Sequence, residues 1–421
     1  MAAEGVAARV AAVAILDAIL GERMILAEVL AFPNGPLHGL SPSDRGRAQR
    51  LALTTLRHME QADRVLAPHL RRAPPRTVAN VLRLGVVELA VEGAAAHGVV
   101  NACVDIVRRG RKTGHMAGLV NAVLRKLSAE TDLFAAMPPQ RMPMWLRQPL
   151  VHAWGRPAVT AMEAVQAQIP PLDLTLKPGA SPIEGAIPLP TGSWRLNGAG
   201  QVSALPGYAS GDWWVQDAAA ALPARLLDAQ PGERVLDLCA APGGKTLQLA
   251  AAGADVTALD ISPQRLKRLI ENLTRCGLKA QVVTADALEW QPAELFDAVL
   301  LDAPCSATGT VRRHPDLPFA KDGSEISNLI DLQSRLIDRA LGFLKPGGRL
   351  VFCTCSLLPD EGEVQLASAL SRHPGLKLEE PALAGVPEDW RAVGGGLRTR
   401  PDYWPERGGI DGFFMARLRR S

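Results

Sequence analysis

The sequence predicts an α/β domain with a mostly parallel sheet, preceded by an all-α domain and a small α+β connecting region. Three observations lead to this fold class. Apolar residues recur at helical spacing through residues 1–130, and Gly and Pro are frequent in residues 131–215. From Trp213 onward, short apolar runs alternate with stretches that have a helical pattern. We therefore expect three domains, at residues 1–130, 131–215 and 216–421.

The first domain is expected to be a helical bundle. One apolar stripe at helical spacing occupies residues 10–20, and a second occupies residues 78–89. Either Ser41 or Ser43 is suited to cap a helix that continues through residues 45–57, because a serine hydroxyl accepts a hydrogen bond from a free backbone N–H.

The third domain has the pattern of a parallel sheet with crossover helices. Its apolar runs are short and rich in Val and Leu, as in strands that are buried on both faces. Helices are expected from about Lys245, from about Pro263, and from Asn328 to Leu344, where Lys-Pro-Gly-Gly ends the last one. The predicted strands are residues 235–238, 256–260, 281–284, 298–302, 350–353 and 411–418, with a further extended piece at 172–176 in the connecting region.

Composition excludes several classes of protein. Six cysteines in 421 residues, with no CxxC pair, argue against a disulfide framework and against a zinc site. The first thirty residues lack the three-part pattern of a signal peptide, and no apolar run is long enough for a membrane helix. We therefore expect a cytoplasmic protein that has no membrane-spanning segment and binds no metal. We also expect it to be a monomer.

The charge is unevenly divided along the chain. The net charge is +3, but residues 1–130 hold 17 Lys and Arg against 11 Asp and Glu, and the rest hold 29 against 32. The cluster Arg108, Arg109, Arg111 and Lys112 favours a nucleic-acid partner. A solvated helix face is the alternative interpretation of the same cluster.

Two cysteines stand just beyond predicted strands. Cys305 follows the run that ends at Asp302, and Cys355 follows the run that ends at Cys353. Ligands of open α/β sheets bind at the carboxyl ends of the strands, so these thiols are expected beside a ligand crevice. A pair of thiols there suggests covalent chemistry with one nucleophile and one acid or base. The alternative is a pair of buried, inert thiols.

A loop of small residues follows the first strand of the α/β domain and opens a helix. Small residues let a ligand approach the backbone, and the helix start offers free N–H groups. The loop has neither the GxGxxG spacing of dinucleotide folds nor the spacing of a P-loop. Its residues are Cys239, Ala240, Ala241, Pro242, Gly243, Gly244 and Lys245.

Three aspartates stand at successive strand ends. Asp260 is suited to accept the hydroxyls of a ribose, and Asp286 to accept the exocyclic amine of adenine. Asp302 ends the next strand, directly before Ala-Pro-Cys. For each aspartate alone, a turn or cap role is the alternative, but their shared position favours a ligand.

Four segments together resemble the RNA cytosine-5 methyltransferases of the NOL1/NOP2/Sun family. They are CAAPGGK at 239–245, LDAPCSATGT at 301–310, RRHPD at 312–316 and TCSLLPDEGE at 354–363. The helical amino-terminal part makes the chain similar to the RsmB/Fmu/Sun group of that family, which has a domain resembling the antitermination factor NusB. The resemblance covers essentially the whole chain. An additional thiol, Cys353, precedes the last motif and is expected to serve packing.

The resemblance implies the cofactor, the partner and the catalytic residues. The cofactor would be S-adenosylmethionine, held by the 239–245 loop, Asp260, Asp286 and Asp302. The fold would be a Rossmann-like methyltransferase domain behind a NusB-like RNA-binding domain, and the substrate would be 16S ribosomal RNA or a small-subunit assembly intermediate. Cys355 would be the nucleophile, and Cys305 would help to release the product.

The expected chemistry explains why two thiols are needed. A thiolate that attacks C6 of cytosine makes C5 able to take a methyl group, and the C5 proton must then leave before the thiol is expelled. The residues alone also allow the reverse roles, because Pro304-Cys305 looks like the nucleophile of DNA cytosine-5 methyltransferases. Asp302 would contact the cofactor or the base, and Lys245 would support the reacting base or cap the loop.

Two other classes of function remain open at the level of sequence. One is a methyltransferase with another acceptor, such as DNA, protein or a small molecule. The other is an RNA-binding scaffold with a degenerate methyltransferase fold. The paired cysteines argue against amine acceptors, because N-methylation needs no thiol, and the choice of RNA over DNA rests on the family resemblance. Cys305 and Cys355, with Lys245, Asp260 and Asp302, argue against a degenerate site. Arg312, Arg313 and His314 are suited to contact the phosphates that flank an extruded cytosine.

Overall fold

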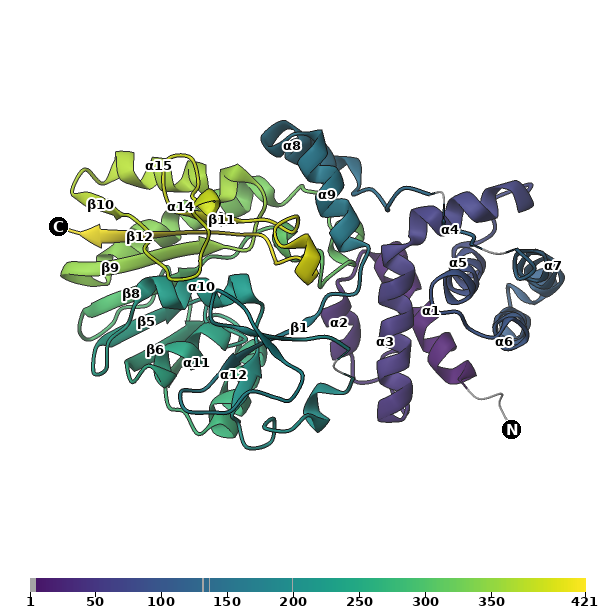
Figure 1. Ribbon diagram of the computed structural model, residues 1–421, viewed down its shortest axis with the longest axis horizontal. Coiled ribbons are helices and arrows are strands. Elements are labelled where there is room, and N and C mark those ends of the chain that lie inside the picture. Colours follow the sequence, from purple (N-terminus) through teal and green to yellow (C-terminus); the bar gives the residue numbers. More distant parts are fainter. Residues whose placement is uncertain (1–4, 131, 136, 199) are drawn as a thin grey trace. The chain divides into compact units, whose positions relative to one another are not determined.

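The computed structural model describes residues 5–130, 132–135, 137–198 and 200–421. Thr131, at which the predicted connecting domain begins, lies outside this range. The chain forms two compact units, which we call the helical unit and the α/β unit (Figure 1). The helical unit contains the described residues up to 148 together with 156–169 and 311–322, and the α/β unit contains 149–155, 170–310 and 323–421.

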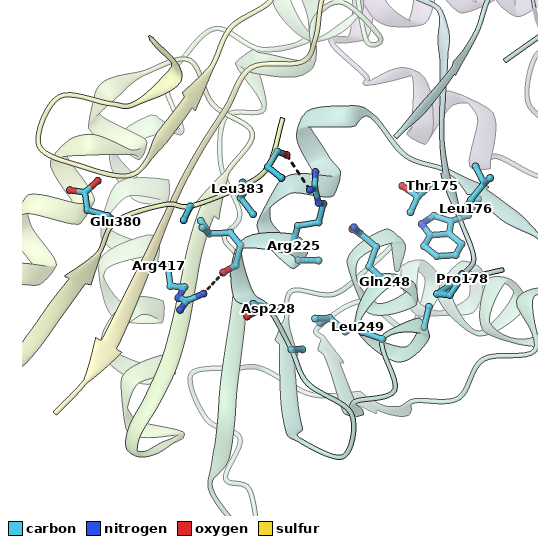
Figure 2. Close-up of a pocket in the computed structure, with 18 residues that line it drawn as sticks. Thr175, Leu176, Pro178, Arg225, Asp228, Gln248, Leu249, Glu380, Leu383 and Arg417 are labelled. Atoms are coloured by element: carbon cyan, nitrogen blue, oxygen red, sulfur yellow. Dashed lines mark hydrogen bonds between the residues drawn. The ribbon is translucent and has the colours of Figure 1, made fainter. Parts of the chain in front are cut away.

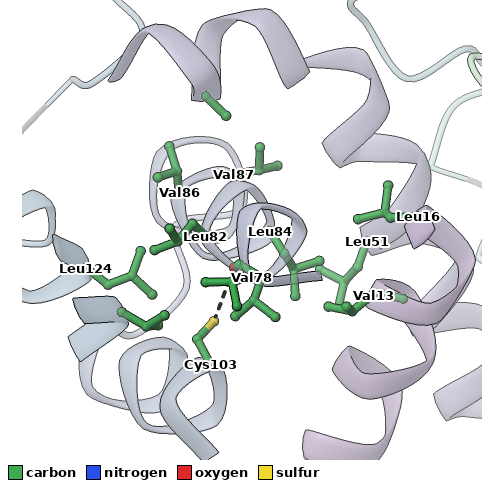
Figure 3. Packing of buried hydrophobic residues seen from close by; sticks show 14 of the residues in the cluster. Val13, Leu16, Leu51, Val78, Leu82, Leu84, Val86, Val87, Cys103 and Leu124 are labelled. Carbon is green, nitrogen blue, oxygen red and sulfur yellow. Dashed lines mark hydrogen bonds between the residues drawn. The ribbon is translucent and has the colours of Figure 1, made fainter. Parts of the chain in front are cut away.

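The helical unit packs its helices around one apolar core, which confirms the predicted all-α amino-terminal part. Figure 3 shows Val78, Leu82 and Leu84 of the fifth helix in this core, with Cys103 and Leu124 beside them. Burial raises the pKa of the Cys103 thiol to about 12, so this cysteine is an inert part of the core. The helices are α1 (Val6–Glu22), α2 (Leu26–Ala31), α3 (Pro42–Arg57), α4 (Met59–Leu66), α5 (Arg76–Ala90), α6 (Ala96–Arg109) and α7 (Ala117–Leu127).

The start of α3 resolves the choice between two predicted caps. The Ser41 hydroxyl accepts a hydrogen bond from the Asp44 backbone N–H at 3.2 Å, and Pro42 occupies the first helical position. Ser41 is therefore the cap, whereas Ser43 lies inside the first turn. Among the described residues, no helix is both long and apolar enough to cross a membrane.

The α/β unit is built on a large sheet with the strand order β10-β12-β9-β8-β5-β6-β7, and β11 pairs with β12. Strands β9, β8, β5, β6 and β7 are parallel, and β12 runs antiparallel to its neighbours. The predicted, mostly parallel sheet is therefore confirmed. The strands are β5 (Arg234–Leu238), β6 (Asp255–Asp260), β7 (Gln281–Thr284), β8 (Phe296–Asp302), β9 (Leu344–Thr354), β10 (Leu376–Glu379), β11 (Leu397–Thr399) and β12 (Phe413–Arg420).

Apolar cores cover both faces of this sheet. Along β5, Leu236 and Leu238 belong to the core under α14 and α15, whereas Val235 belongs to the core under α10 and α11. Burial on both faces explains why these strands have continuous apolar runs in the sequence. The helices are α10 (Ala218–Leu227), α11 (Gly244–Ala251), α12 (Pro263–Cys276), α13 (Leu317–Ala320, in the helical unit), α14 (Ile326–Gly342) and α15 (Glu363–Arg372).

The described residues of the connecting region form two α-helices and a small antiparallel sheet. The helices are α8 (Met144–Trp154) and α9 (Arg156–Gln166), and the sheet has the order β2-β3-β1-β4. Its strands are β1 (Leu172–Leu176), β2 (Ile187–Pro188), β3 (Trp194–Leu196) and β4 (Trp213–Val215), so the predicted extended piece at 172–176 is a strand.

A buried ion pair ties the small sheet to the rest of the α/β unit. The Arg195 guanidinium donates to both carboxylate oxygens of Asp173 at 2.6 and 2.8 Å, and neither side chain is exposed. Arg195 also donates to the backbone oxygens of Arg407 and Gly409, and Asp173 accepts from the Ala218 N–H at the start of α10. A buried pair is stable only when its remaining hydrogen bonds are satisfied in this way.

The start of β9 differs from the prediction. The helix α14 ends at Gly342, close to the expected boundary, but β9 already begins at Leu344. Leu344 pairs with Phe296 and Arg349 pairs with Ala298, so residues 345–348 form a bulge within the strand. The expectation that the Lys-Pro-Gly-Gly segment ends the helix is therefore wrong, because the helix already ends at Gly342, before this segment, and the segment lies inside β9.

Candidate active site

The predicted site residues collect along one edge of the large sheet. Parallel strands present their carboxyl ends at the same edge, and the order β9-β8-β5-β6-β7 sets the sequence of residues along it. Cys355 follows β9, Asp302 ends β8 with Cys305 three residues later, and Cys239 follows β5. Asp260 ends β6. The sheet thus gathers residues that are far apart in the chain.

The two thiols are neighbours. The Sγ atoms of Cys305 and Cys355 lie 3.4 Å apart, within the distance of a sulfur hydrogen bond. Both side chains are half-buried, and the Gly309 N–H donates to the Cys355 carbonyl oxygen at 2.9 Å. The hydrogen bond to Cys355, together with burial and the nearby charge of Glu361, raises the pKa of Cys305. Cys305 therefore keeps its proton at neutral pH.

A lysine and an aspartate form an ion pair on the same edge. The Lys245 Nζ donates to Asp302 Oδ2 at 2.7 Å, with 9% of the lysine side chain and 30% of the aspartate side chain exposed. Burial disfavours the charged lysine, but the attraction of Asp302 outweighs it and raises the Lys245 pKa. Lys245 is therefore a fixed cation that holds Asp302 in place.

The additional thiol, Cys353, lies beside Asp302 on the adjacent strand β9. Cys353 is fully buried and is the β-ladder partner of Asp302, and its Sγ lies 3.5 Å from Asp302 Oδ1. Burial and the Asp302 charge raise its pKa. Cys353 thus both packs in the core, as expected, and donates a hydrogen bond to the carboxylate.

The loop of small residues turns tightly at the end of β5. Its first residue, Cys239, has a positive φ of 61°, and Gly243 has a φ of 106° directly before α11 begins. A Cβ at Gly243 would lie 2.8 Å from the Leu269 side chain, so this position needs glycine. The Ala240 N–H donates to the Leu259 carbonyl oxygen at 3.0 Å, which fixes the loop against β6.

Asp260 and Asp286 both accept hydrogen bonds from backbone N–H groups. Asp260 is 2% exposed and accepts from the N–H groups of Ala241 at 3.1 Å and Ser262 at 2.9 Å. Asp286 is half-buried and accepts from the Leu288 N–H at 2.9 Å. These bonds give each aspartate a local structural role, and their contact with a ligand stays a prediction.

Sequence reasoning missed two buried carboxyl groups at this edge. Asp237 in β5 accepts from the Thr246 hydroxyl at 2.6 Å, while its other oxygen has no hydrogen-bond partner among the residues that the structure describes. Burial raises the pKa of Asp237 to about 7. Glu361 is also fully buried and accepts from Ser306 and Ser356, the residues that follow the two cysteines. The sequence signal that could have pointed to Glu361 is its place in the TCSLLPDEGE segment, one of the four segments that carry the family resemblance.

The arginines that follow the Cys305 loop belong to the helical unit and differ in exposure. Arg312 is fully buried, so its predicted contact with phosphate is not available to its side chain in this structure. Arg313 is half-buried, and His314 is exposed. Burial and the nearby charges of Arg312 and Arg313 lower the pKa of Arg57 to about 10. The segment therefore contributes a cationic cluster within the helical unit.

The basic cluster at the end of α6 is exposed. The side chains of Arg108, Arg109, Arg111 and Lys112 all face solvent. Arg109 forms an ion pair with Asp105, one helical turn earlier, at 2.6 Å. The helical unit therefore presents a compact group of cations at one helix end, as the sequence predicts.

A cavity of about 600 Å³ lies elsewhere in the α/β unit (Figure 2). It is lined by the ends of α10 and α11, including Arg225 and Gln248, and by Arg417 of β12. None of the described residues that line it belongs to the predicted site. Among the residues that the structure describes, no cluster of His, Cys, Asp and Glu is suited to hold a metal ion.

Known proteins match both parts of the chain. Residues 224–419 match the family described as 16S rRNA methyltransferase RsmB/F, and residues 6–129 match the NusB family. The ribosomal RNA small subunit methyltransferase B of Klebsiella pneumoniae subsp. pneumoniae is 35% identical, over 90% of this chain and 91% of that protein. The protein of the same name from Xanthomonas campestris pv. campestris is 36% identical, over 100% and 98%.

A solved structure extends the similarity of fold over the full length. The crystal structure of PH0851 aligns with a TM-score of 0.75 and 22% identity, over 100% of both chains. At that identity the likeness concerns the fold, whereas the two relatives at 35% and 36% identity establish the family. The chain therefore belongs to the RsmB/F family of 16S rRNA methyltransferases, with a NusB-family domain at its amino terminus.

Proposed function

We propose that the protein transfers a methyl group from S-adenosylmethionine to C5 of a cytosine in 16S ribosomal RNA. In this proposal Cys355 forms a covalent bond to C6 of the base, and Cys305 helps to break that bond. The observation that carries the proposal is the distance of 3.4 Å between the two Sγ atoms, at the ends of adjacent parallel strands. Two thiols so close fit a reaction in which one sulfur attacks and the other handles a proton.

The raised pKa of Cys305 supports this division of roles. A protonated Cys305 beside the Cys355 sulfur can give its proton to that sulfur as the C6–S bond breaks. In the same step Cys305 takes up the proton that leaves C5, so that the C5–H bond breaks together with the C6–S bond. Cys355 loses one proton to solvent when it again becomes a thiolate. Every bond that forms during addition is thus broken again, apart from the new bond between C5 and the methyl carbon.

The residues at the edge of the sheet fit the proposed cofactor. The left-handed Gly243 and the start of α11 offer close backbone approach, and the buried Asp260 carboxylate suits the hydroxyls of a ribose. S-adenosylmethionine would supply the methyl group when bound there. We assign its binding to the 239–245 loop, Asp260, Asp286 and Asp302.

In the proposal the Lys245–Asp302 pair also binds the target cytosine at the same edge of the sheet. Asp302 is partly exposed, so its carboxylate can accept a hydrogen bond from the cytosine amine while Lys245 keeps it charged. A base in structured RNA has to leave its stack to reach this edge, because the reacting atoms of a stacked base are covered.

In the proposal the exposed cluster Arg108, Arg109, Arg111 and Lys112, at the end of α6, binds the phosphates of the RNA. The enzyme would act as a monomer in the cytoplasm, where ribosomal RNA is found.

Substitution of each thiol tests the catalytic roles. We expect Cys355→Ala to abolish methyl transfer and leave cofactor affinity intact, because in the proposal this thiol bonds to the base and takes no part in holding the cofactor. We expect Cys305→Ala to accumulate a covalent protein–RNA adduct, because addition and methylation proceed while release is slowed. Denaturing gels of each variant with RNA and cofactor measure the adduct. Cys103→Ala, which removes a buried thiol of the helical unit, is the control. An adduct in Cys355→Ala alone would reverse the roles.

A second substitution tests the cofactor site. Asp260→Ala is expected to weaken S-adenosylmethionine binding by about 1–3 kcal/mol, since the ribose loses a hydrogen-bonded acceptor. Calorimetric titration measures this affinity directly. Asp255→Ala, at the exposed opposite end of the same strand, is the matched control. If Asp260→Ala binds the cofactor as tightly as wild type, the carboxylate lies outside the site.

The basic cluster is tested through the salt dependence of RNA binding. Replacing Arg108, Arg109, Arg111 and Lys112 with Ala should weaken binding and reduce the log–log salt slope by roughly 0.7–0.9 per lost phosphate contact. Because Asp105 holds Arg109, we expect the other three cations to account for most of the change. The double substitution of the exposed Lys267 and Arg268 with Ala controls for general loss of charge. An unchanged slope would mean that the cluster is only a solvated helix face.

A further inference from the structure

The carboxylate of Glu361 lies between the loops that carry the two thiols. Ser306 follows Cys305, and its backbone N–H donates to Glu361 Oε1 at 2.9 Å. Ser356 follows Cys355, and its hydroxyl donates to Glu361 Oε2 at 2.5 Å. The Ser306 hydroxyl donates to the same Oε2 atom. One side chain therefore accepts hydrogen bonds from the residue next to each catalytic cysteine.

Further contacts join the two loops around this carboxylate. The Ser306 and Ser356 hydroxyl oxygens lie 3.2 Å apart, and the Thr308 hydroxyl lies 3.2 Å from that of Ser356. The Leu357 N–H donates to the Thr308 hydroxyl at 2.9 Å. The first loop is thus hydrogen-bonded to the second at several points, all fully or nearly fully buried.

A third element, α14, also donates a hydrogen bond to the carboxylate. The Gln333 amide of α14 donates to Glu361 Oε1 at 3.0 Å and to the Pro304 carbonyl oxygen at 2.9 Å. Pro304 directly precedes Cys305, so the first thiol is flanked on both sides by residues that this network holds. The Thr354 hydroxyl, next to Cys355 on the other side, donates to the Glu361 carbonyl oxygen at 2.9 Å.

Burial of the Glu361 carboxylate costs free energy unless all of its hydrogen bonds are formed. Glu361 is fully buried, and moving a carboxylate out of water is unfavourable unless several hydrogen bonds compensate. Bonds to a charged acceptor are shorter and stronger than neutral ones, and a buried network is rigid once every member has a partner. The chain therefore uses a buried charge where neutral residues would fill the space at lower cost.

We propose that Glu361 is a positioning residue that fixes the separation of the two thiols by holding the residues that follow them. The inference rests on the proposed function for its effect on the reaction, but the geometric claim stands independently. Glu361 itself touches neither sulfur through a hydrogen bond in the described network. Its negative charge also contributes to the raised pKa of Cys305, which favours the protonated thiol beside Cys355.

The test compares Glu361→Gln with Asp360→Asn. Glutamine keeps the size of the side chain but replaces one acceptor oxygen with an NH₂ donor, which cannot accept from the N–H and hydroxyl donors that face it. Asp360 is the preceding residue, and its side chain is exposed, so this control removes a neighbouring carboxylate outside the network. Both substitutions are made in the full chain.

The first readout is the separation of the thiols, measured without catalysis. Diamide oxidises two neighbouring thiols, which lose their hydrogens as the S–S bond forms, while its N=N bond is reduced to a hydrazine. Mass spectrometry of peptides measures the rate at which the Cys305–Cys355 disulfide forms. Because loss of the Glu361 charge also lowers the pKa of Cys305 and so favours the reactive thiolate, the rates are compared at the same ionised fraction of Cys305. On that basis we expect Glu361→Gln to slow disulfide formation on the order of tenfold or more, since a displacement of about 1 Å is enough for large losses in proximity-dependent reactions. Asp360→Asn should match wild type.

The second readout is the split between kcat and cofactor affinity. With 16S ribosomal RNA as substrate, Glu361→Gln should lower kcat on the order of a hundredfold while calorimetric affinity for S-adenosylmethionine stays at the wild-type value. Absence of C5 methylation by the wild-type protein would count against the proposed function and leave the disulfide rate as a test of the positioning role. A wild-type disulfide rate in Glu361→Gln would overturn the inference.

A second variant keeps the inference testable if Glu361→Gln does not fold. Ser356→Ala removes one donor from the carboxylate and leaves Glu361, Ser306 and Gln333 in place. We expect it to slow disulfide formation less than Glu361→Gln does, but measurably. A folded Ser356→Ala protein with the wild-type rate would contradict the role assigned to Glu361.

Discussion

The parallel pairing of β8 with β9 is the constraint on which the site depends. Its register sets Asp302 opposite Cys353, and the chain leaves both strands at the same edge of the sheet. Cys305 and Cys355 are fifty residues apart in the sequence, and this pairing brings them within 3.4 Å. A shift of the register by one residue would turn Asp302 to the other face of the sheet and separate it from Lys245. The chemistry of the site is therefore a consequence of strand register.

Buried charged groups then hold in place the residues that the strand register brings together. Lys245 and Asp302 neutralise each other at the edge of the sheet, and Glu361 is satisfied by hydrogen bonds from both cysteine loops. Such groups are weak contributors to stability because their desolvation cost offsets most of their attraction. They are strong contributors to geometry, because each has few arrangements in which its hydrogen bonds are complete. The site thus gives up some stability for a fixed arrangement of reacting groups.

Much of this structure follows from patterns in the sequence, and the exceptions have physical reasons. The central strands β5, β6, β8 and β9 were predictable because burial on both faces demands uninterrupted apolar runs, whereas the short strands β10 and β11 were not predicted. Cys305 and Cys355 were predictable as residues at strand ends. Glu361 was not, because an acidic residue in a polar loop is usually exposed, and its burial depends on donors from three separate segments. Arg312 was misassigned for the same reason, since its burial depends on tertiary packing. Local sequence shows which residues are charged, but tertiary packing decides which charges are covered.

The position of the transferred methyl group tests the account most directly. Unmodified 16S ribosomal RNA made by transcription in vitro can be incubated with the protein and methyl-labelled S-adenosylmethionine, digested to nucleosides, and separated by liquid chromatography with mass spectrometry. The account predicts the label in 5-methylcytidine, because only C5 transfer requires the thiol pair at the ends of β8 and β9. Label in a ribose 2′-O-methyl nucleoside or in N4-methylcytidine would contradict it.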